Sequence, residues 1–251
     1  MNVGFYQNAS ALSALERWQD AVAQNITSSQ TSGYRKRTAN VLATPGGEVR
    51  TGARSGGSNA STAVPMQFPQ LLAGINFKQG EVQPTRREFD LALQGEGFFE
   101  VRRPDGNLLY TRSGEFRMRL DRTLITASGE EVLNSEGEPI VLQPDNGKLS
   151  VNLDGTLMQG TTQLGRLGVK EFEDPSKLEA LAGDFFRAPA GSPPPVLSEK
   201  PEVLQGFLES SNVSPLREMV DIIVITRAYE ANQKMISTVD QQMQKALDAL
   251  G

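Results

Sequence analysis

The sequence predicts an α+β protein in which long helices at the two chain ends form a coiled-coil-like pair and the middle of the chain forms a mainly antiparallel β domain. Two observations predict this class. Near both ends, apolar residues recur at alternating spacings of three and four, which is the period of helices that pack along a seam. Between the ends, short segments of alternating apolar residues are separated by tight-turn dipeptides, a pattern typical of antiparallel strands.

The C-terminal helix is predicted to begin at Pro215. Ser214 can cap it, Pro215 suits the first helical position, and Glu218 and Asp221 lie near the positive end of the helix dipole. A helix from Pro215 to Leu250 would be about 54 Å long at ~1.5 Å per residue, which is longer than a compact domain of this size covers. We therefore expect both terminal helices to become ordered when neighbouring chains bury their apolar seams.

The two seams give the predicted assembly interface. The alternative is that each helix packs only on its own domain, as apolar stripes at helical spacing usually do. Asn232 suits a register-setting role within the seam, but an exposed Asn at the helix edge is an equal alternative. Asn8, Gln19 and Ala246 complete the alternation. The predicted interface residues are Phe5, Leu12, Leu15, Val22, Ile26, Ile222, Ile225, Tyr229, Asn232, Ile236, Val239, Met243 and Leu250.

The middle of the chain reads as a β domain, because dipeptides such as Asp105-Gly106 and Asp154-Gly155 recur at hairpin spacing. Before it, Thr44 to Pro65 is rich in glycine and serine and is expected to be flexible. The predicted β-domain core consists of Phe89, Leu91, Leu93, Phe98, Phe99, Tyr110 and Phe116. The predicted division of the chain is a helical assembly domain of residues 1–40 plus 206–251, a flexible or extended connector at 41–80, and a β-rich outer domain at 81–205.

Composition argues against several classes of function. The 251 residues include no cysteine and no histidine, which removes disulfides, thiolate and imidazole metal ligands, and nucleophiles that depend on either residue. A net charge of −5 argues against a nucleic-acid partner, and the cluster Arg35, Lys36 and Arg37 reads as a solvated helix end. No apolar run is long enough for a membrane span, and no secretory signal is visible. We therefore expect no cofactor, no metal, no nucleic acid and no membrane insertion.

Two further sequence patterns could in principle mark a nucleotide-binding site or a catalytic site. Gly95-Glu96-Gly97 lacks the third glycine and the strand-loop-helix context of a nucleotide site, so a tight turn is the better interpretation. Asp90 with Glu96 or Glu100 could act as an acid and base pair on a glycan. Among 30 acidic residues such pairs arise by accident, and only a cleft or a shifted pKa would favour the pair. The chain is predicted not to be an enzyme, with no catalytic, cofactor-binding or metal-binding residues.

Three stretches of the chain carry a family resemblance. Residues 23–37 contain Ala-Gln-Asn-Ile and Thr-Ser-Gly-Tyr-Arg-Lys-Arg, residues 79–116 contain Phe-Asp-Leu-Ala-Leu-Gln-Gly-Glu-Gly-Phe-Phe, and residues 206–234 contain Gly-Phe-Leu-Glu-Ser-Ser-Asn-Val. In these stretches, which cover roughly half of the chain, the sequence resembles the bacterial flagellar basal-body rod and hook protein family. It departs from the family at Gln24, where the family has Asn, and at Arg122, where glycine usually follows the aspartate.

The resemblance implies a non-catalytic subunit of a hollow drive shaft that transmits torque across the periplasm, with terminal helices inside and the β domain outside. It implies assembly with copies of the same chain as a helical homopolymer, with other rod and hook subunits, with the flagellar type III export apparatus and with basal-body ring proteins. Export would proceed from the cytoplasm without a cleaved signal peptide. Length favours a rod subunit over a hook protein, and residues 227–234 resemble distal-rod more than proximal-rod members. The alternatives are an adhesin-like β-domain binding module with oligomerisation helices, and a cell-wall hydrolase.

Overall fold

The computed structural model describes residues 3–50, 63–144, 147–181 and 183–248. By its contacts, the chain divides into two compact units. The helical unit comprises residues 1–26, 37–74 and 215–251, and the β unit comprises residues 27–36 and 75–214. Each unit is described by itself. The functional division predicted from the sequence, with a connector at 41–80, stays a prediction.

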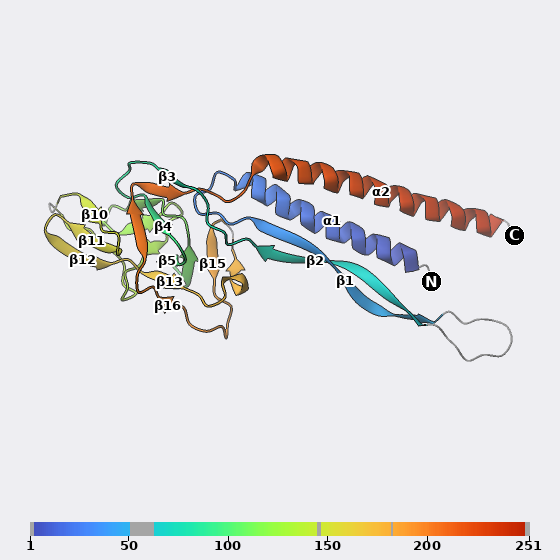
Figure 1. The fold of residues 1–251 in the computed structure, drawn as a ribbon, viewed down its shortest axis with the longest axis horizontal. Helices are drawn as coiled ribbons and strands as arrows, with labels where there is room; N and C mark the ends of the chain where they lie inside the picture. Colours follow the sequence, from blue (N-terminus) through green and yellow to red (C-terminus); the bar gives the residue numbers. More distant parts are fainter. Residues whose placement is uncertain (1–2, 51–62, 145–146, 182, 249–251) are drawn as a thin grey trace. The chain divides into compact units, whose positions relative to one another are not determined.

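The helical unit contains two helices and a two-stranded sheet (Figure 1). Its elements are α1 (Val3–Thr27), β1 (Arg37–Arg50), β2 (Ala63–Ile75) and α2 (Pro215–Asp248). The predicted start of α2 at Pro215 is confirmed. Ser10 on α1 donates a hydrogen bond from Oγ to the carbonyl of Pro69 on β2 at 2.9 Å, so α1 contacts the sheet. Of the segment predicted to be flexible, residues 51–62 lie outside the described residues, and the flanking residues belong to β1 and β2.

The structure fits the α+β class, but the predicted coiled-coil-like pair of helices is wrong. The side chains that α1 buries belong to Ala14, Val22 and Asn25, whereas Gln19 of the predicted seam is exposed. Ala14, Val22 and Asn25 follow the 3.6-residue period of a straight helix, which drifts away from a strict seven-residue repeat. Among the described residues, α1 contacts α2 through a hydrogen bond between two polar side chains, Asn25 and Glu218, and long coiled-coil helices are not observed.

The β unit consists of short strands in antiparallel pairs. Its largest sheet has nine strands among the described residues and runs in the order β14-β15-β6-β5-β9-β8-β7, with β13 pairing to both β5 and β16. Smaller sheets have the orders β10-β11-β12, β17-β4 and β18-β3. The elements are β3 (Val82–Pro84), β4 (Leu91–Gln94), β5 (Phe98–Arg102), β6 (Leu108–Thr111), β7 (Phe116–Met118), β8 (Leu124–Thr126), β9 (Glu131–Val132), β10 (Leu149–Val151), β11 (Thr156–Gln159), β12 (Thr162–Arg166), β13 (Val169–Glu171), a 3-10 turn η1 (Pro175–Lys177), β14 (Glu179–Ala180), β15 (Phe185–Arg187), β16 (Val196–Leu197), β17 (Glu202–Gln205) and β18 (Phe207–Glu209).

Strand β5 supplies side chains to two apolar clusters, because consecutive residues of a strand point to opposite faces of the sheet. Phe99 lies in the larger cluster, where its ring meets that of Phe116 edge to face at 5.1 Å. Phe98 lies in the smaller cluster with Tyr110 and Phe186. Leu91 and Leu93 are buried in the larger cluster, and Phe89 packs against it half-buried. All seven predicted core residues therefore contact one of the two clusters.

Candidate functional site

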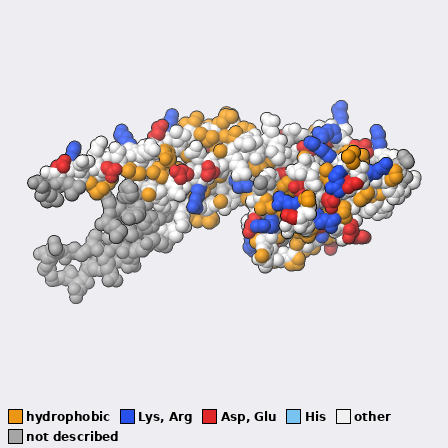
Figure 2. Space-filling view, turned by 180° about the vertical axis from the view of Figure 1, so that it is seen from behind, with side chains coloured by type: hydrophobic (Ala, Val, Ile, Leu, Met, Phe, Trp, Pro, Cys, Tyr) orange, Lys and Arg blue, Asp and Glu red, His pale blue; other side chains and the backbone are white. Residues whose placement is uncertain are grey.

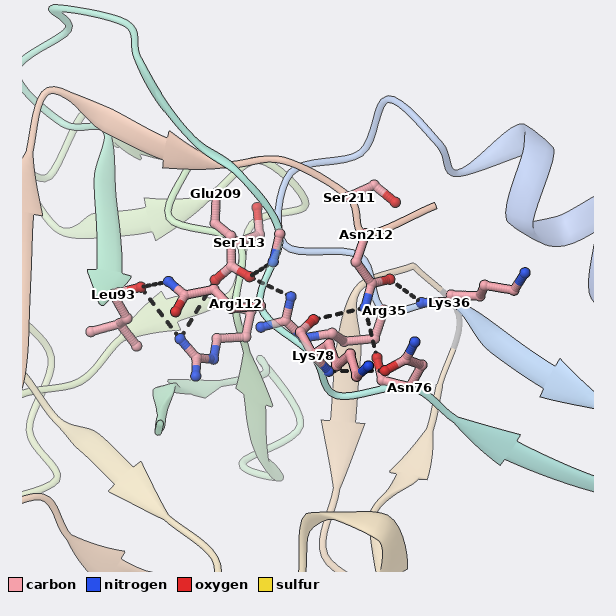
Figure 3. A network of polar contacts seen from close by, with 12 residues as sticks. Arg35, Lys36, Asn76, Lys78, Leu93, Arg112, Ser113, Glu209, Ser211 and Asn212 are labelled. Carbon is pink, nitrogen blue, oxygen red and sulfur yellow. Dashed lines mark hydrogen bonds and ion pairs between the residues drawn. The ribbon is translucent and has the colours of Figure 1, made fainter. Parts of the chain in front are cut away.

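A network of polar contacts in the β unit joins three chain segments that are distant in sequence (Figure 3). We call it the polar junction. The segments follow α1, follow β2 and precede α2, so each adjoins an element of the helical unit in sequence. The residues that these three segments contribute to the polar junction are Arg35, Lys36, Asn76, Lys78, Glu209 and Asn212, and Arg112 joins them from a fourth segment, after β6.

Glu209 is the anionic centre of the polar junction and is completely buried. Its Oε1 accepts hydrogen bonds from the guanidinium of Arg35 and from the backbone N–H of Gly80, the latter at 2.8 Å. Its Oε2 lies 3.5 Å from Nη1 of Arg112. A buried carboxylate is tolerated only where charged and hydrogen-bonded partners replace water. Glu209 therefore holds Arg35, which lies next to β1 in sequence, against the β unit.

Arg112 approaches Glu209 from the end of β6. Burial lowers the pKa of Arg112 to about 10, an effect that the charge of Glu209 partly offsets. Its guanidinium also lies 5.4 Å from the centre of the Phe98 ring and donates a hydrogen bond to the carbonyl of Gly95. These contacts place two buried cations beside one buried anion, so the loss of Glu209 would leave both guanidinium groups without their carboxylate.

Asn212 ties the three segments together through one side-chain amide. Its Oδ1 accepts a hydrogen bond from the backbone N–H of Lys36 at 2.7 Å, and its Nδ2 donates to the carbonyls of Asn76 and Lys78 at 2.8 and 2.7 Å. The N–H of Asn76 in turn donates to the carbonyl of Lys36 at 2.8 Å. Only an amide offers an acceptor and two donors in this arrangement.

Gly33 allows the segment after α1 to approach the β unit closely. Its φ is +71°, a left-handed conformation that favours glycine, and its N–H donates to the carbonyl of Glu209 at 2.7 Å. A Cβ at this position would lie 2.3 Å from the backbone nitrogen of Ser113.

The prediction that the basic cluster is a solvated helix end is wrong for Arg35, since only 2% of its surface is exposed.

A second polar cluster lies within the helical unit. Asn25 on α1 accepts a hydrogen bond from the N–H of Arg37 on β1 at 2.8 Å and donates to its carbonyl at 2.9 Å. The second hydrogen of Nδ2 goes to Glu218 on α2 at 2.9 Å. Both Asn25 and Glu218 are completely buried. One side chain thus connects α1, β1 and α2.

The predicted assembly residues show a graded exposure. Val22 on α1 and Ile225 on α2 are buried, whereas Met243 is exposed. The side chains of Phe5 and Leu250 lie outside the described residues. The half-buried residues of the predicted interface are Leu12, Leu15, Ile26, Ile222, Tyr229, Asn232, Ile236 and Val239. Asn232 donates to the carbonyl of Ala228 in its own helix at 3.0 Å.

A second apolar face of α2 was missed by the sequence analysis. About half or more of the surface of each member is exposed, and the members lie over the first half of the helix, where Figure 2 shows hydrophobic side chains gathered. Their spacing of three and four follows one helical face and was a signal in the sequence. The predicted seam from Ile222 onward lies on another face of the same helix. We call this face the α2 stripe, and it consists of Leu216, Met219, Val220, Ile223 and Val224.

The acidic residues considered for glycan chemistry lie in different surroundings, two of them buried near a cation and one exposed. Asp90 is buried 3.5 Å from Nε of Arg87. Glu100 lies 3.5 Å from Nζ of Lys170, and its pKa is raised because burial outweighs that cation. Glu96 is exposed. Within the described part of the chain, no cluster of three acidic side chains could hold a metal ion, and neither helix is long and apolar enough to cross a membrane.

Comparison with known proteins finds two matching family models. Residues 204–249 match the C-terminal model of the flagellar basal body rod FlgEFG proteins, and residues 92–159 match the D1 domain of the flagellar hook proteins FlgE/F/G. The first match includes Glu209, Asn212 and Glu218, and the second includes Arg112. Arg35, Lys36, Asn76, Lys78, Asn25 and Arg37 lie outside both models.

This chain aligns with three similar proteins over nearly the whole length of both partners. The flagellar basal-body rod protein FlgF of Caulobacter vibrioides is 31% identical over 100% of this chain and 99% of its own. FlgF of Mesorhizobium japonicum is 31% identical with the same coverage, and FlgG of Borreliella burgdorferi is 31% identical over 94% of each chain. Because both FlgF and FlgG occur among the relatives, the preference for a distal-rod type stays a prediction.

Proposed function

Because this chain belongs to the flagellar basal-body rod protein family, we propose that copies of it polymerise into a hollow drive shaft that transmits torque across the periplasm. The family is one of structural rod proteins, and the chain is a structural subunit of the flagellar basal body. Rod proteins assemble with other rod and hook subunits. Export through the flagellar type III apparatus and contact with ring proteins belong to the same proposal.

The α2 stripe is the observation that carries the proposal of polymerisation. Five large aliphatic side chains lie on one exposed face of a helix whose opposite face is only partly buried. Covering an aliphatic side chain stabilises by about 1.5–3 kcal/mol. A helix that is apolar on two faces needs partners on both sides, which repeated contacts between copies can provide.

The proposal predicts that α2 gains order on assembly. Its exposed apolar residues extend from Leu216 to Met243, so the single chain leaves most of the helix without a covering layer. Amide hydrogens of residues 229–243 should therefore exchange much faster in the monomer than in the polymer. Equal protection in both states would contradict the proposal.

Substitution of the α2 stripe tests the same proposal directly. The double variant Val220→Asp with Ile223→Asp places two charges on an exposed face, so the monomer should keep its circular dichroism spectrum. The concentration at which polymer first sediments should rise at least about tenfold, which corresponds to about 1.4 kcal/mol. Val196→Asp, at a more exposed apolar residue of the β unit, is the control. Unchanged polymerisation of the double variant would overturn the proposal.

A further inference from the structure

The hairpin of β7 and β8 borders a groove of the β unit with a volume of about 610 Å³. Its apolar lining comes from Phe89, Met118, Leu120, Leu142 and Leu149. Leu120 sits at the tip of the β7–β8 turn and is fully exposed, and half of the surface of Met118 is exposed as well. An exposed apolar groove next to a protruding leucine marks an interaction surface.

Arg122 lines this groove and brings a positive charge to it. Its φ is +69°, a left-handed conformation that a residue with a Cβ avoids. The neighbouring Arg119 is bound by Asp121 and Glu131, whereas Arg122 forms no ion pair within the described residues. Glu88 is engaged as an acceptor for the N–H of Leu149. The positive charge at the groove therefore favours an occupant that carries a carboxylate.

The tip of the β10–β11 hairpin offers a complementary knob. Leu153 is 65% exposed, and Asp154 follows it directly. The Asp154 carboxylate accepts hydrogen bonds from the N–H and hydroxyl of Thr156 but forms no ion pair among the described residues. These bonds hold the pKa of Asp154 below its usual range, so the knob carries a fixed negative charge beside its leucine.

The knob and the groove lie at opposite ends of one hairpin. Leu149 pairs with Gln159 at the open end of the hairpin, where both residues line the groove, and Leu153 lies four residues further along, in the turn. At ~3.3 Å per residue the separation is about 13 Å. A short antiparallel hairpin with a tight turn cannot fold its tip back onto its own base. The knob of one copy can therefore fill only the groove of another copy.

We propose that the Leu153–Asp154 turn of one copy of this chain docks in the groove beside Arg122 of the next copy. The inference rests on the proposed polymerisation and deepens it, because it assigns a specific contact between β units. The contact is heterologous, since knob and groove are different surfaces, and it repeats from copy to copy without closing a pair. Leu153 fills the apolar groove, and the Asp154 carboxylate meets the guanidinium of Arg122.

Cysteine cross-linking tests the contact, and the chain has no cysteine of its own. A variant that carries both Leu153→Cys and Met118→Cys should give a ladder of disulfide-linked multimers when the polymer is oxidised. Mixing the two single variants should give dimers, and each alone should give none. The control pair, Val196→Cys with Met118→Cys, should not cross-link. Dimers without a ladder from the double variant, or no cross-link in a sample that polymerises, would overturn this inference and leave polymerisation intact.

A double-variant cycle gives an independent readout. Arg122→Gly suits the left-handed backbone, and Asp154→Asn keeps an acceptor for Thr156, so neither should unfold the monomer. Each should raise the critical concentration about fivefold, and the double variant no further, because both remove one interaction. A critical concentration of the double variant that is raised about 25-fold, the product of the two single effects, would overturn the pairing. If the unmodified chain forms no polymer at any concentration, both the inference and the proposed function fail.

Discussion

Asn25 on α1 and Glu218 on α2 form a hydrogen bond of 2.9 Å between two completely buried side chains. The same Asn25 side chain exchanges two hydrogen bonds with the backbone of Arg37. A polar contact thus fixes the relation of α1 to α2 near the start of α2. Because hydrogen bonds are directional, it specifies the relative rotation of the helices more tightly than an apolar contact would.

Replacement of Asn25 should destabilise the helical unit. Asn25→Ala would leave the Glu218 carboxylate and both backbone groups of Arg37 without this partner inside the protein, at a cost of about 2–3 kcal/mol. Asn232→Ala is the matched control, since among the described residues Asn232 donates only to the carbonyl of Ala228 in its own helix, and it should cost less than about 0.5 kcal/mol. Denaturant titration followed by far-UV circular dichroism measures both. Equal effects of the two substitutions would contradict the role assigned to Asn25.

The anionic centre of the polar junction gives a second prediction. Glu209→Gln should destabilise the β unit by about 3–5 kcal/mol, because two buried guanidinium groups lose their carboxylate. Glu115→Gln removes a more exposed carboxylate that pairs with Arg87 and Arg117, and it should cost less than about 1 kcal/mol. Tryptophan fluorescence reports poorly on the β unit, since Trp18 lies on α1, so near-UV circular dichroism of the tyrosine and phenylalanine residues is the better measurement.

Gly33 provides a test that separates backbone strain from steric exclusion. Gly33→Ala combines a left-handed φ with a Cβ placed 2.3 Å from the nitrogen of Ser113, so a loss of at least about 3 kcal/mol is expected. Gly106→Ala has a similar φ of +85° but open space around the new methyl group, and should cost only about 1 kcal/mol. Thermal unfolding compares the two variants. A loss for Gly33→Ala no larger than that for Gly106→Ala would show that the segment after α1 can move away from the β unit.

Asp184 predicts a pH dependence of stability. Burial raises its pKa, an effect that hydrogen bonds from Thr111 and Ser113 only partly offset, and the charge of Glu130 raises it further. A carboxyl group with a raised folded-state pKa binds more protons when folded. Its favourable contribution is therefore complete below the unfolded pKa of about 3.9 and is lost as the pH rises through the folded value.

Asp184→Asn should therefore stabilise the protein at pH 7 relative to the unsubstituted chain and lose this advantage below about pH 4. The amide keeps an oxygen that can accept the hydrogen bond of Thr111. Melting temperatures at a series of pH values measure the difference. Asp174→Asn, at an exposed carboxylate whose hydrogen bonds lower its pKa, should show the opposite dependence. A difference for Asp184→Asn that does not change with pH would disprove the assignment.

The sequence predicted the α+β class, the start of α2 and the alternating strands because these depend on local patterns. Pro215 at the first helical position and the turn glycines need no knowledge of distant residues. The burial of Arg35 depends on Glu209, which is 174 positions away, and no local pattern joins them. The available signal was Glu209 at the end of the otherwise apolar strand β18, since a buried carboxylate requires a buried cation.

The predicted seam failed for a different physical reason. A spacing of three and four describes where apolar residues lie on a helix, but it does not say which face a neighbour covers. Among the described side chains of α1, the buried ones are Ala14, Val22 and Asn25, of which Val22 alone is a large apolar residue. The departure at Arg122 was visible in the sequence, yet only the structure shows that the turn forms with arginine in the position that favours glycine.

Asn212 has a mechanical consequence for the segments that it binds. Its amide joins residues 36, 76 and 78 at one point, so a force that separates these segments acts on the hydrogen bonds of a single side chain. A change at Asn212 would release all three segments together.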